Sequence, residues 1–404
     1  MLRNPDWKTA RDLLLSAVTP VGTERIALSS SGGRVLAADL TAQSDIPPFD
    51  RSPYDGYAFR SADTAGAGPE HPITLTVTET IAAGQVPTRP VLPGTAARLM
   101  TGAPIPEGAD AVCMFEKTVF TDTDVTLREA YGPGENVIRA GEDVRGGTVL
   151  ARAGDVIDAG TAGTLASQDV PEPLVYRRPR VGLISTGDEV TEPGTPLGPG
   201  QIRNANRYTL ETALARAGME PVWLGLAGDD EARIASLIRA GAASCDAVVL
   251  TGGVSVGDRD LTPAAMEAAG CRILLRGVDM KPGMACAYGI AGDRLVCGLS
   301  GNPASSLTNF CVIALPALRR LAGHREPVQA EITVTLRDSF AKKSPSWRFL
   351  RGRLDLSDGT ARMILPPDQG NVVLSSSIGC DVMAAVPAGS GKLAAGTTLK
   401  GFLL

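Results

Sequence analysis

Between residues 180 and 323, short apolar runs alternate with segments of helical spacing, and several of the runs end in glycine-rich loops. The apolar runs at 181–184, 221–226, 247–251, 272–275 and 294–298 predict buried strands. Helices are predicted at 206–217, from Asp229 or Asp230 to Ala240, at 262–269, and from Asn302 onward with Pro303 at the first helical position. This alternation predicts a mostly parallel sheet in a three-layer α/β domain with right-handed crossovers. Ligands of such sheets bind beyond the carboxyl ends of the strands.

Four loops lie at or just beyond the ends of these strands. They are S-T-G-D-E at 185–189, T-G-G-V-S-V-G-D-R-D at 251–260, K-P-G at 281–283 and S-G-N-P at 300–303. Glycine allows backbone N–H groups to approach an anion closely, and paired carboxylates can hold a hard cation, so the set indicates a phosphate and Mg²⁺ site. The anion-binding candidates are Ser185, Thr186, Gly187, Asp188, Gly252, Gly253, Ser255, Gly257, Pro282, Gly283, Ser300, Gly301, Asn302 and Pro303.

The cation candidates are the carboxylates of Asp188, Glu189, Asp258 and Asp260, and Lys281 is a point charge suited to an oxyanion. Each loop taken alone also fits a turn without a ligand. Asp260 precedes a predicted helix and could cap it, and Lys281 could be a solvated loop residue.

The composition excludes several classes of protein. With two histidines in 404 residues, a histidine-based triad or a histidine-rich zinc site is not expected. The formal net charge of −5 argues against a nucleic-acid binder that relies on overall positive charge. The seven cysteines form no C-x-x-C pair, which favours reduced, buried thiols in a cytoplasmic protein. We expect no signal peptide and no membrane span, because no apolar stretch approaches about 18 residues.

The segments before residue 180 and after residue 327 have a different sequence pattern, with short runs typical of strands. A helix is predicted near the N-terminus, with Asn4 as its cap and Pro5 at its first position. From residue 26 to about 175, short β-branched runs at 72–79, 96–100, 111–115 and 125–127 alternate with glycine and proline, apart from a short helix at 160–168. Residues 171–179, with three prolines, are predicted as a linker. After residue 327, alternation at 330–336 and later turns predict a small β-barrel or sandwich.

Two N-terminal segments are too dense in Pro, Asp, Tyr and Gly for generic loops, although periodicity assigns them no role. They are D-I-P-P-F-D-R-S-P-Y-D-G-Y-A at 45–58 and T-G-A-P-I-P-E-G-A-D at 101–110. A hinge between domains and a simple turn are the alternatives to a functional role. Thr101 with Gly102 could hold an anion.

These segments resemble signatures of the molybdopterin molybdenumtransferases, the family of bacterial MoeA and the E domain of gephyrin. Residues 50–58 resemble the family's D-x-S-x-x-D-G-Y-A, and residues 101–110 resemble its T-G-A-P-x-P-x-G-A-D. Residues 134–139 and 141–143 resemble the next block, and the four loops from 185 to 303 follow in family order. The resemblance covers about residues 5 to 400.

The resemblance implies an architecture. It comprises an N-terminal linker region at 1–175 with an inserted β-rich domain at about 53–140, an α/β molybdopterin-binding domain at 176–326, and a C-terminal β-barrel at 327–404. The α/β domain is similar to the adenylyltransferase that makes the family's substrate, and that enzyme is a possible partner.

The resemblance also implies a reaction, which is the Mg²⁺-dependent insertion of molybdate into adenylylated molybdopterin with release of AMP. The implied catalytic residues are Asp55, Thr101, Asp143, Glu189, Asp260 and Lys281. In the family, the N-terminal residues among them come from the other subunit of a homodimer, so the active site is shared.

The chain departs from the family pattern in four places. It has K-P-G-M-A at 281–285 where the family has K-P-G-K-P, and Ser300 where the family has proline. Residues 204–206 are N-A-N instead of D-S-N, and residues 369–376 match the family's Q-G-S segment only in part. These departures leave alternatives open: a divergent paralogue that binds molybdopterin or acts as a scaffold, one that inserts tungstate, or a nucleotidyl-transfer enzyme built on the same α/β domain.

Overall fold

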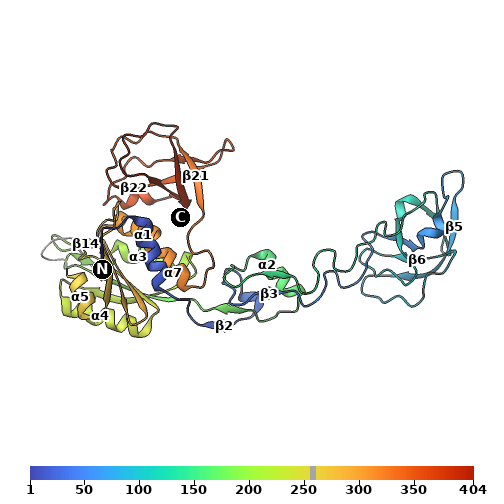
Figure 1. Ribbon diagram of the computed structural model, residues 1–404, viewed down its shortest axis with the longest axis horizontal. Helices are drawn as coiled ribbons and strands as arrows, with labels where there is room; N and C mark the ends of the chain where they lie inside the picture. Colours follow the sequence, from blue (N-terminus) through green and yellow to red (C-terminus); the bar gives the residue numbers. More distant parts are fainter. Residues whose placement is uncertain (255–260) are drawn as a thin grey trace. The chain divides into compact units, whose positions relative to one another are not determined.

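The computed structural model describes residues 1–254 and 261–404, and its contacts divide the chain into two compact units (Figure 1). The first unit contains Met1–Ala38, Ala153–Ala162 and Glu172–Leu404. The second contains Asp39–Arg152 and Gly163–Pro171. Helix α2 (Ala159–Ser167) has residues in both units.

The first unit is built on a sheet with the strand order β1-β17-β19-β20-β16-β12-β15 among the described residues. The strands are β1 (Leu2–Arg3), β12 (Arg180–Thr186), β15 (Glu220–Ala227), β16 (Ala247–Thr251), β17 (Arg272–Arg276), β19 (Cys286–Ala291) and β20 (Arg294–Leu299). Strands β20, β16, β12 and β15 are parallel, so their carboxyl ends lie at one edge. Strand β19 is antiparallel to both neighbours. The sequence pattern did not predict it, because the run at 286–291 follows the K-P-G loop without a helix between the strands.

Helices cover both faces of this sheet, which confirms the predicted three-layer α/β domain (Figure 1). On one face, α4 (Glu231–Ser244) and α5 (Thr262–Ala268) pack against the apolar side chains of β12, β16 and β20. The other face carries α1 (Trp7–Ala17), α3 (Ala205–Arg216), α6 (Pro303–Asn309), the π turn η4 (Phe310–Ala314) and α7 (Leu315–Leu321).

The first helix begins later than predicted. The carboxylate of Asp6, rather than Asn4, accepts hydrogen bonds from the N–H groups of Lys8 at 3.0 Å and Thr9 at 3.2 Å. Asn4 has a φ of 44°, outside the range of a normal N-cap, and it precedes the helix. Both residue types are good caps, so composition alone did not distinguish them.

The C-terminal part of the first unit is a closed five-stranded barrel, as the resemblance implied. Its strands are β21 (Glu331–Leu336), β22 (Trp347–Asp355), β23 (Arg362–Ile364), β24 (Val382–Val386) and β25 (Thr398–Leu403), with the turn η5 (Leu374–Ser377). Closure follows because β24 pairs with both β25 and β22. The barrel joins the α/β core through Trp7, whose ring packs edge-on against Trp347 and Phe349.

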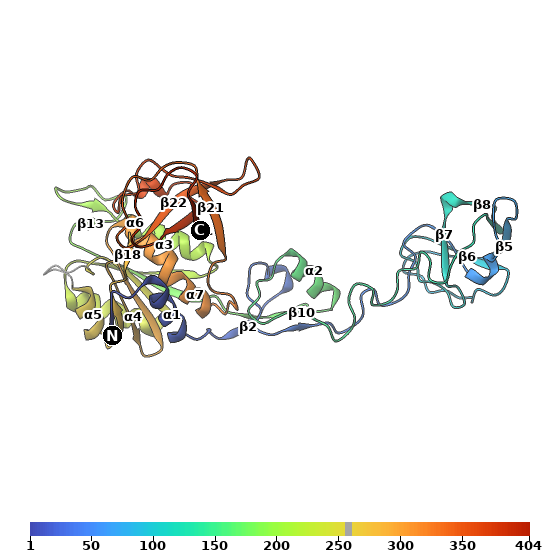
Figure 2. The same cartoon turned by 45° about the horizontal axis from the view of Figure 1, so that its top comes forward.

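Short strand pairs complete the first unit. Strand β18 (Met280–Lys281) extends along β22, and β13 (Val190–Thr191) pairs with β14 (Ile202–Arg203) in a ribbon outside the main sheet (Figure 2). Strand β2 (Thr23–Arg25), which is followed by the turn η1 (Leu28–Ser30), pairs with β11 (Leu174–Tyr176). The segment predicted as a linker at 171–179 therefore contains a paired strand, whose short apolar run L-V-Y was hidden among prolines.

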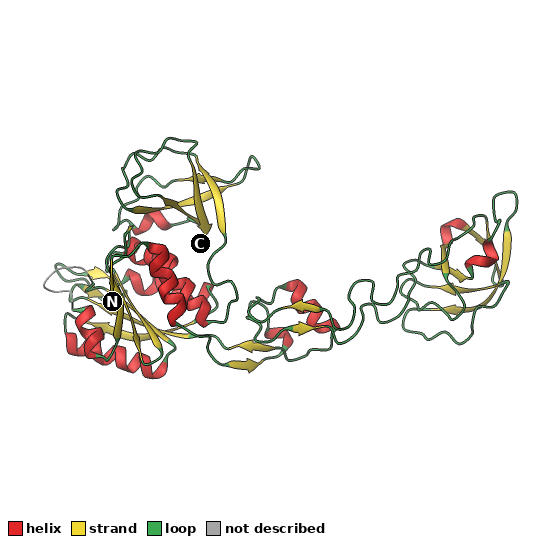
Figure 3. Ribbon diagram, viewed as in Figure 1, coloured by secondary structure: helices red, strands yellow, loops and turns green. Residues whose placement is uncertain are grey.

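The second unit consists mainly of strands and loops (Figure 3). Its sheet has the order β7-β4-β6-β5-β9-β8, with β4 (Gly56–Phe59), β5 (Ile73–Ile81), β6 (Thr95–Leu99), β7 (Ala111–Met114), β8 (Thr118–Phe120) and β9 (Asp124–Leu127). The turns η2 (Ser61–Thr64) and η3 (Phe115–Lys117) connect these strands. A separate pair joins β3 (Leu40–Thr41) to β10 (Val149–Ala151). The predicted runs at 72–79, 96–100, 111–115 and 125–127 are strands here.

Candidate functional site

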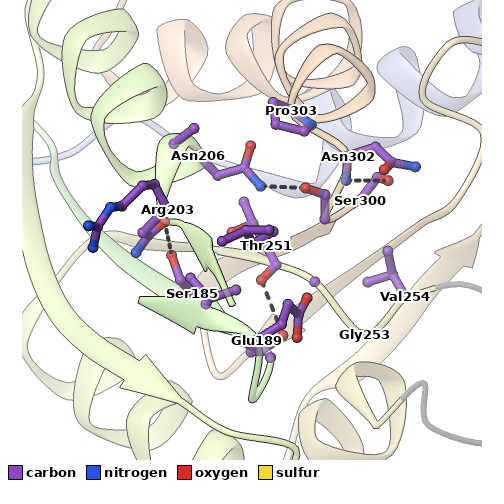
Figure 4. Close-up of a pocket in the computed structure, with 18 of the residues that line it drawn as sticks. Ser185, Glu189, Arg203, Asn206, Thr251, Gly253, Val254, Ser300, Asn302 and Pro303 are labelled. Carbon is purple, nitrogen blue, oxygen red and sulfur yellow. Dashed lines mark hydrogen bonds between the residues drawn. The ribbon is translucent and has the colours of Figure 1, made fainter. Parts of the chain in front are cut away.

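A cavity of about 550 Å³ lies at the carboxyl ends of the parallel strands of the first unit (Figure 4). Three of the four predicted loops line it, because β12, β16 and β20 are adjacent and parallel and all end at this edge. The lining comprises Ser185–Gly187, Glu189, Val190, Ile202–Asn206, Asp229, Thr251–Val254, Ala285, Ser300–Pro303 and Val372.

The glycines of the cavity serve close packing of the strand ends. Gly252 has a φ of +104°, and a Cβ there would lie 2.4 Å from Thr186 Oγ1. Its N–H donates to the carbonyl of Leu299 at 3.0 Å, and the N–H of Gly187 donates to the carbonyl of Ala227 at 3.0 Å. These two amides therefore already have acceptors within the protein. The N–H of Gly253 has no acceptor among the residues that the structure describes.

Hydroxyl groups line the floor of the cavity. Ser185 Oγ and Asn204 Oδ1 lie 3.1 Å apart, and Thr186 Oγ1 donates to the carbonyl of Thr251 at 3.2 Å. All of these residues are buried, so the geometry of the floor is held by hydrogen bonds between neighbouring strand ends.

The carboxylate of Glu189 lies in the cavity beneath Gly187, where a Cβ on that glycine would be 2.5 Å from Glu189 Oε2. Within the described ranges, no side chain or backbone donor bonds to the Glu189 carboxylate. Asp188 differs: its Oδ1 accepts from the N–H of Asp229 at 3.1 Å, and it does not line the cavity. The two adjacent carboxylates therefore have separate environments, and Glu189 is the one that lines the cavity.

The S-G-N-P loop leads directly into α6, and its residues Ser300–Pro303 line the cavity. The side chain of Asn302 makes no capping hydrogen bond, although the sequence predicted it as the cap. Ser300 Oγ accepts instead from the N–H of Asn302 at 3.2 Å. Ser300 thus supplies a local hydrogen bond that proline could not.

Two asparagines that sequence reasoning treated only as departures from the family lie in the cavity wall. Asn204 caps α3 by accepting from the N–H of Arg207 at 3.2 Å, and its Nδ2 donates to Glu192 Oε1 at 2.7 Å. Asn206 Nδ2 donates to the carbonyl of Gly301 at 2.8 Å, which ties α3 to the S-G-N-P loop. Their spacing on one turn of a capped helix was the available signal. No sequence signal indicated Val372, which reaches the cavity from the barrel segment.

The K-P-G loop is not part of this cavity. Lys281 is exposed in β18, directly opposite Arg348 in the register of β18 and β22, and only Ala285 of this segment lines the cavity. Pro282 is buried, and Gly283 lies against α6, where its carbonyl accepts from Asn309 Nδ2 at 2.6 Å. Met284, which stands where the family has a second lysine, is half exposed.

The structure describes two of the four predicted cation ligands, Asp188 and Glu189. Ser255, Gly257, Asp258 and Asp260 lie outside the described residues. In the ranges 1–254 and 261–404, no three His, Cys, Asp or Glu side chains gather in a metal-binding cluster. Of the four predicted ligands, the structure places Glu189 in the cavity and Asp188 beside it.

The second unit brings together the three motif segments of the N-terminal half. The N–H of Ser52 donates to the carbonyl of Ala103, and Arg51 pairs with Ile138 on one side and Pro104 on the other. Segments 50–58, 101–110 and 134–139 therefore form one hydrogen-bonded surface, a contact that spacing in the sequence could not indicate.

Asp55 and Thr101 form a direct pair on this surface. Asp55 Oδ1 accepts from the backbone N–H of Thr101 at 2.6 Å and from its hydroxyl at 2.7 Å. The two hydrogen bonds, the backbone one first, lower the pKa of the exposed Asp55 carboxyl, with a further contribution from the charge of Arg98. Asp143 is exposed, and its N–H donates to the carbonyl of Ile46 at 3.0 Å. No hydrogen bond in the described chain links Asp143 to Asp55 or Thr101.

In the described part of the chain, no helix is both long enough and apolar enough to span a bilayer.

Comparisons with known proteins match both halves of the chain. Residues 6–168 match the family model described as MoeA N-terminal region (domain I and II), and residues 182–320 match the one described as probable molybdopterin binding domain.

A molybdopterin molybdenumtransferase of Staphylococcus aureus is 34% identical over 400 residues, which cover 98% of this chain and 95% of the relative. The protein of the same name from Bacillus subtilis is 37% identical over 341 residues, covering 83% and 79%. A crystal structure of a molybdopterin biosynthesis MoeA protein from Pyrococcus horikoshii superposes with a TM-score of 0.86 at 29% identity, over 99% of this chain and 100% of that one.

Proposed function

Because the chain belongs to the molybdopterin molybdenumtransferase (MoeA) family, we propose that it inserts molybdate into adenylylated molybdopterin and releases AMP. It is an enzyme of molybdenum cofactor biosynthesis. The observation that carries the finer proposal is the cavity at the carboxyl ends of β12, β16 and β20, which contains a carboxylate without a partner among the described residues, beside glycine-rich strand ends. We also propose a cytoplasmic location, which the seven free cysteine thiols support.

In this proposal the pterin substrate binds in the cavity, and its phosphates lie near the N–H of Gly253 and the start of α6. The first N–H groups of a helix have no partner within the helix and carry partial positive charge, so they favour a phosphate. Ser185, Thr186 and Ser300 would orient the ligand through hydroxyl groups. The roles of Gly187 and Gly252 are to permit the close approach of neighbouring strand ends, since their own amides are already bonded.

The residues present fit a magnesium ion in one respect. Glu189 offers carboxylate oxygens, which are the ligands that Mg²⁺ prefers, and the described residues donate no hydrogen bond to them. Asp188, Asp258 and Asp260 are proposed as the other acidic ligands. When bound, the ion would neutralise charge on the phosphates as the phosphoanhydride bond breaks. Lys281 is proposed to contact an anion, with Pro282 and Gly283 shaping its loop.

AMP release by the purified protein tests this function. The assay contains adenylylated molybdopterin, Mg²⁺ and either molybdate or tungstate. We expect AMP release that depends on molybdate. Tight pterin binding without AMP release would instead identify a binding or scaffolding paralogue, an alternative that half-exposed Met284 favours because it removes one cation. AMP release that depends on tungstate more than on molybdate would identify a paralogue that inserts tungstate.

We further propose a homodimer whose active site takes Asp55, Thr101 and Asp143 from one subunit and the cavity from the other. Two inactive variants, Asp55→Asn and Glu189→Ala, should then recover activity when co-expressed with separate tags. Random pairing makes half of the dimers mixed, each with one intact site of two, so about a quarter of the wild-type AMP release is expected. No recovery in purified mixed dimers would rule out the shared site. The adenylyltransferase that supplies the substrate is a proposed transient partner.

A further inference from the structure

Arg98, on β6 of the second unit, has a guanidinium that stacks on two aromatic rings. Its Cζ lies 4.8 Å from the ring centroid of Phe115 and 5.7 Å from that of Phe120. Its Nε is buried and has no hydrogen-bond partner in the described ranges, and no described carboxylate forms an ion pair with it. An arginine without a carboxylate partner in the described ranges, held over two aromatic rings, has its charge fixed in place.

The rings that hold Arg98 form one cluster. Tyr57 packs against Phe115 with centroids 5.3 Å apart and against Phe120 at 6.0 Å, and the two phenylalanines are 5.6 Å apart. Tyr57 is fully buried and lies directly opposite Arg98 in the register of β4 and β6. The cluster therefore connects the ends of β4, β6 and β7.

Both members of the Asp55–Thr101 pair are attached to this cluster. The N–H of Phe115 donates to the backbone carbonyl of Asp55 at 3.1 Å, and Gly56 pairs with Met114 in the sheet. Thr101 follows Arg98 by three residues, just beyond the end of β6. A shift of the Arg98 stack would consequently move both halves of the pair.

We propose that Arg98 is a positioning residue for the reaction: its guanidinium, held over the rings of Phe115 and Phe120, fixes the two strand ends that carry Asp55 and Thr101. This inference rests on the proposed function, in which Asp55 and Thr101 act in the active site. Arg98 itself need not touch the substrate.

Other charged groups near Asp55 do not replace the charge of Arg98. On η3, which follows Phe115, Glu116 adds negative charge, while Lys117 is paired with Glu129 at 3.2 Å. The two hydrogen bonds from Thr101 are the main reason that the pKa of Asp55 is lowered, and the charge of Arg98 lowers it further. Replacing Arg98 removes that charge and loosens the strand ends that form the two hydrogen bonds, so the pKa of Asp55 should rise.

The test uses the full chain with three variants. Arg98→Met removes the charge but keeps an apolar side chain, Arg98→Lys keeps the charge but loses the planar stack, and Arg89→Gln is the matched control. Arg89 belongs to the same unit, and within the described residues its side chain makes a single hydrogen bond, to the carbonyl of Thr78 at 3.3 Å. Thermal unfolding establishes that each variant is folded, and Phe120→Leu, which weakens the stack without touching the charge, serves if Arg98→Met does not fold.

The first readout does not depend on the reaction. Aspartate labelled with ¹³C at the carboxyl carbon is titrated by NMR, and Asp55 is assigned from the signal lost in Asp55→Asn. We expect Asp55 to titrate at higher pH in Arg98→Met and as in the wild type in Arg89→Gln. An unchanged Asp55 titration in Arg98→Met would overturn the inference.

The second readout is AMP release across pH. In Arg98→Met we expect kcat to fall about tenfold and the acidic limb of the profile to move to higher pH. In Arg98→Lys we expect a lower rate with the acidic limb in place, and in Arg89→Gln the wild-type profile. A wild-type rate and profile in Arg98→Met would also refute the role. If the wild type releases no AMP although Asp55 shifts in the titration, the proposed function fails while the positioning of Asp55 by Arg98 stands.

Discussion

Replacing Glu189 with alanine is expected to lower oxyanion-dependent AMP release by about a hundredfold to a thousandfold while leaving the fold intact. The carboxylate lines the cavity at the end of β12, and no donor in the described chain neutralises it. If it holds a cation against the substrate phosphates, its loss removes several kcal/mol of transition-state stabilisation, and each factor of ten in rate corresponds to about 1.4 kcal/mol.

The comparison variants separate charge from shape. Glu189→Gln keeps the size of the side chain and should be nearly as inactive as the alanine variant. Glu220 is the first residue of β15, at the edge of the sheet opposite the cavity. Glu220→Ala removes an exposed glutamate paired with Arg180 at 3.3 Å and should keep full activity. AMP release at saturating pterin and the midpoint of thermal unfolding are measured for all three. A Glu189→Ala protein with close to wild-type AMP release would show that this carboxylate has no part in the reaction.

The second large effect is expected for Gly252→Ala. Gly252 has a φ of +104°, which an L side chain rarely adopts, and the new Cβ would lie 2.4 Å from Thr186 Oγ1 and 2.8 Å from the Thr186 carbonyl oxygen. The strained backbone alone costs about 1–3 kcal/mol. The clash with the neighbouring backbone must also push β12 and β16 apart at their carboxyl ends, so pterin binding should weaken at least about tenfold.

The measurements are the midpoint of urea unfolding and the dissociation constant of the pterin. Gly163→Ala is the control, because Gly163 lies in α2, a Cβ added there would meet no heavy atom within 4 Å, and its φ is not positive. Alanine there should be neutral or should stabilise the helix by roughly 0.5–1 kcal/mol. If Gly252→Ala unfolds at the wild-type urea concentration and binds pterin normally, the packing of these strand ends does not limit the site.

The strand and helix pattern of the α/β domain could be predicted from the chain, because each element there is long and regular. Ala247–Thr251 is a strand with the predicted bounds, and Asp230 caps α4 as one of the two predicted candidates, with its carboxylate accepting from the N–H of Arg233 at 3.1 Å. Errors occurred where local signals were weak or equivalent. The cap of α1 is Asp6, and Leu174–Tyr176 is a strand only because β2 is beside it.

The candidate site was predictable in its loops but not in its hydrogen bonds. Sequence reasoning placed Ser185, Glu189 and Gly253 at strand ends, and the parallel sheet brings them together. It could not tell that the N–H of Gly252 is already bonded to Leu299, or that Lys281 pairs along β22 instead of lining the cavity. Such facts depend on which groups meet across long stretches of chain.

By itself, the sequence determined the family and the fold class, since its motifs, apolar periodicities and glycine positions are local features that can be recognised without a structure. Only the tertiary structure decided which of those residues share a surface. It joined Asp55 to Thr101 across 46 positions and stacked Arg98 on Phe115 and Phe120. It also left Glu189 without a donor in the described residues. The physical reason is that hydrogen bonds, ring contacts and burial depend on distances in space, and strand order and register set these distances.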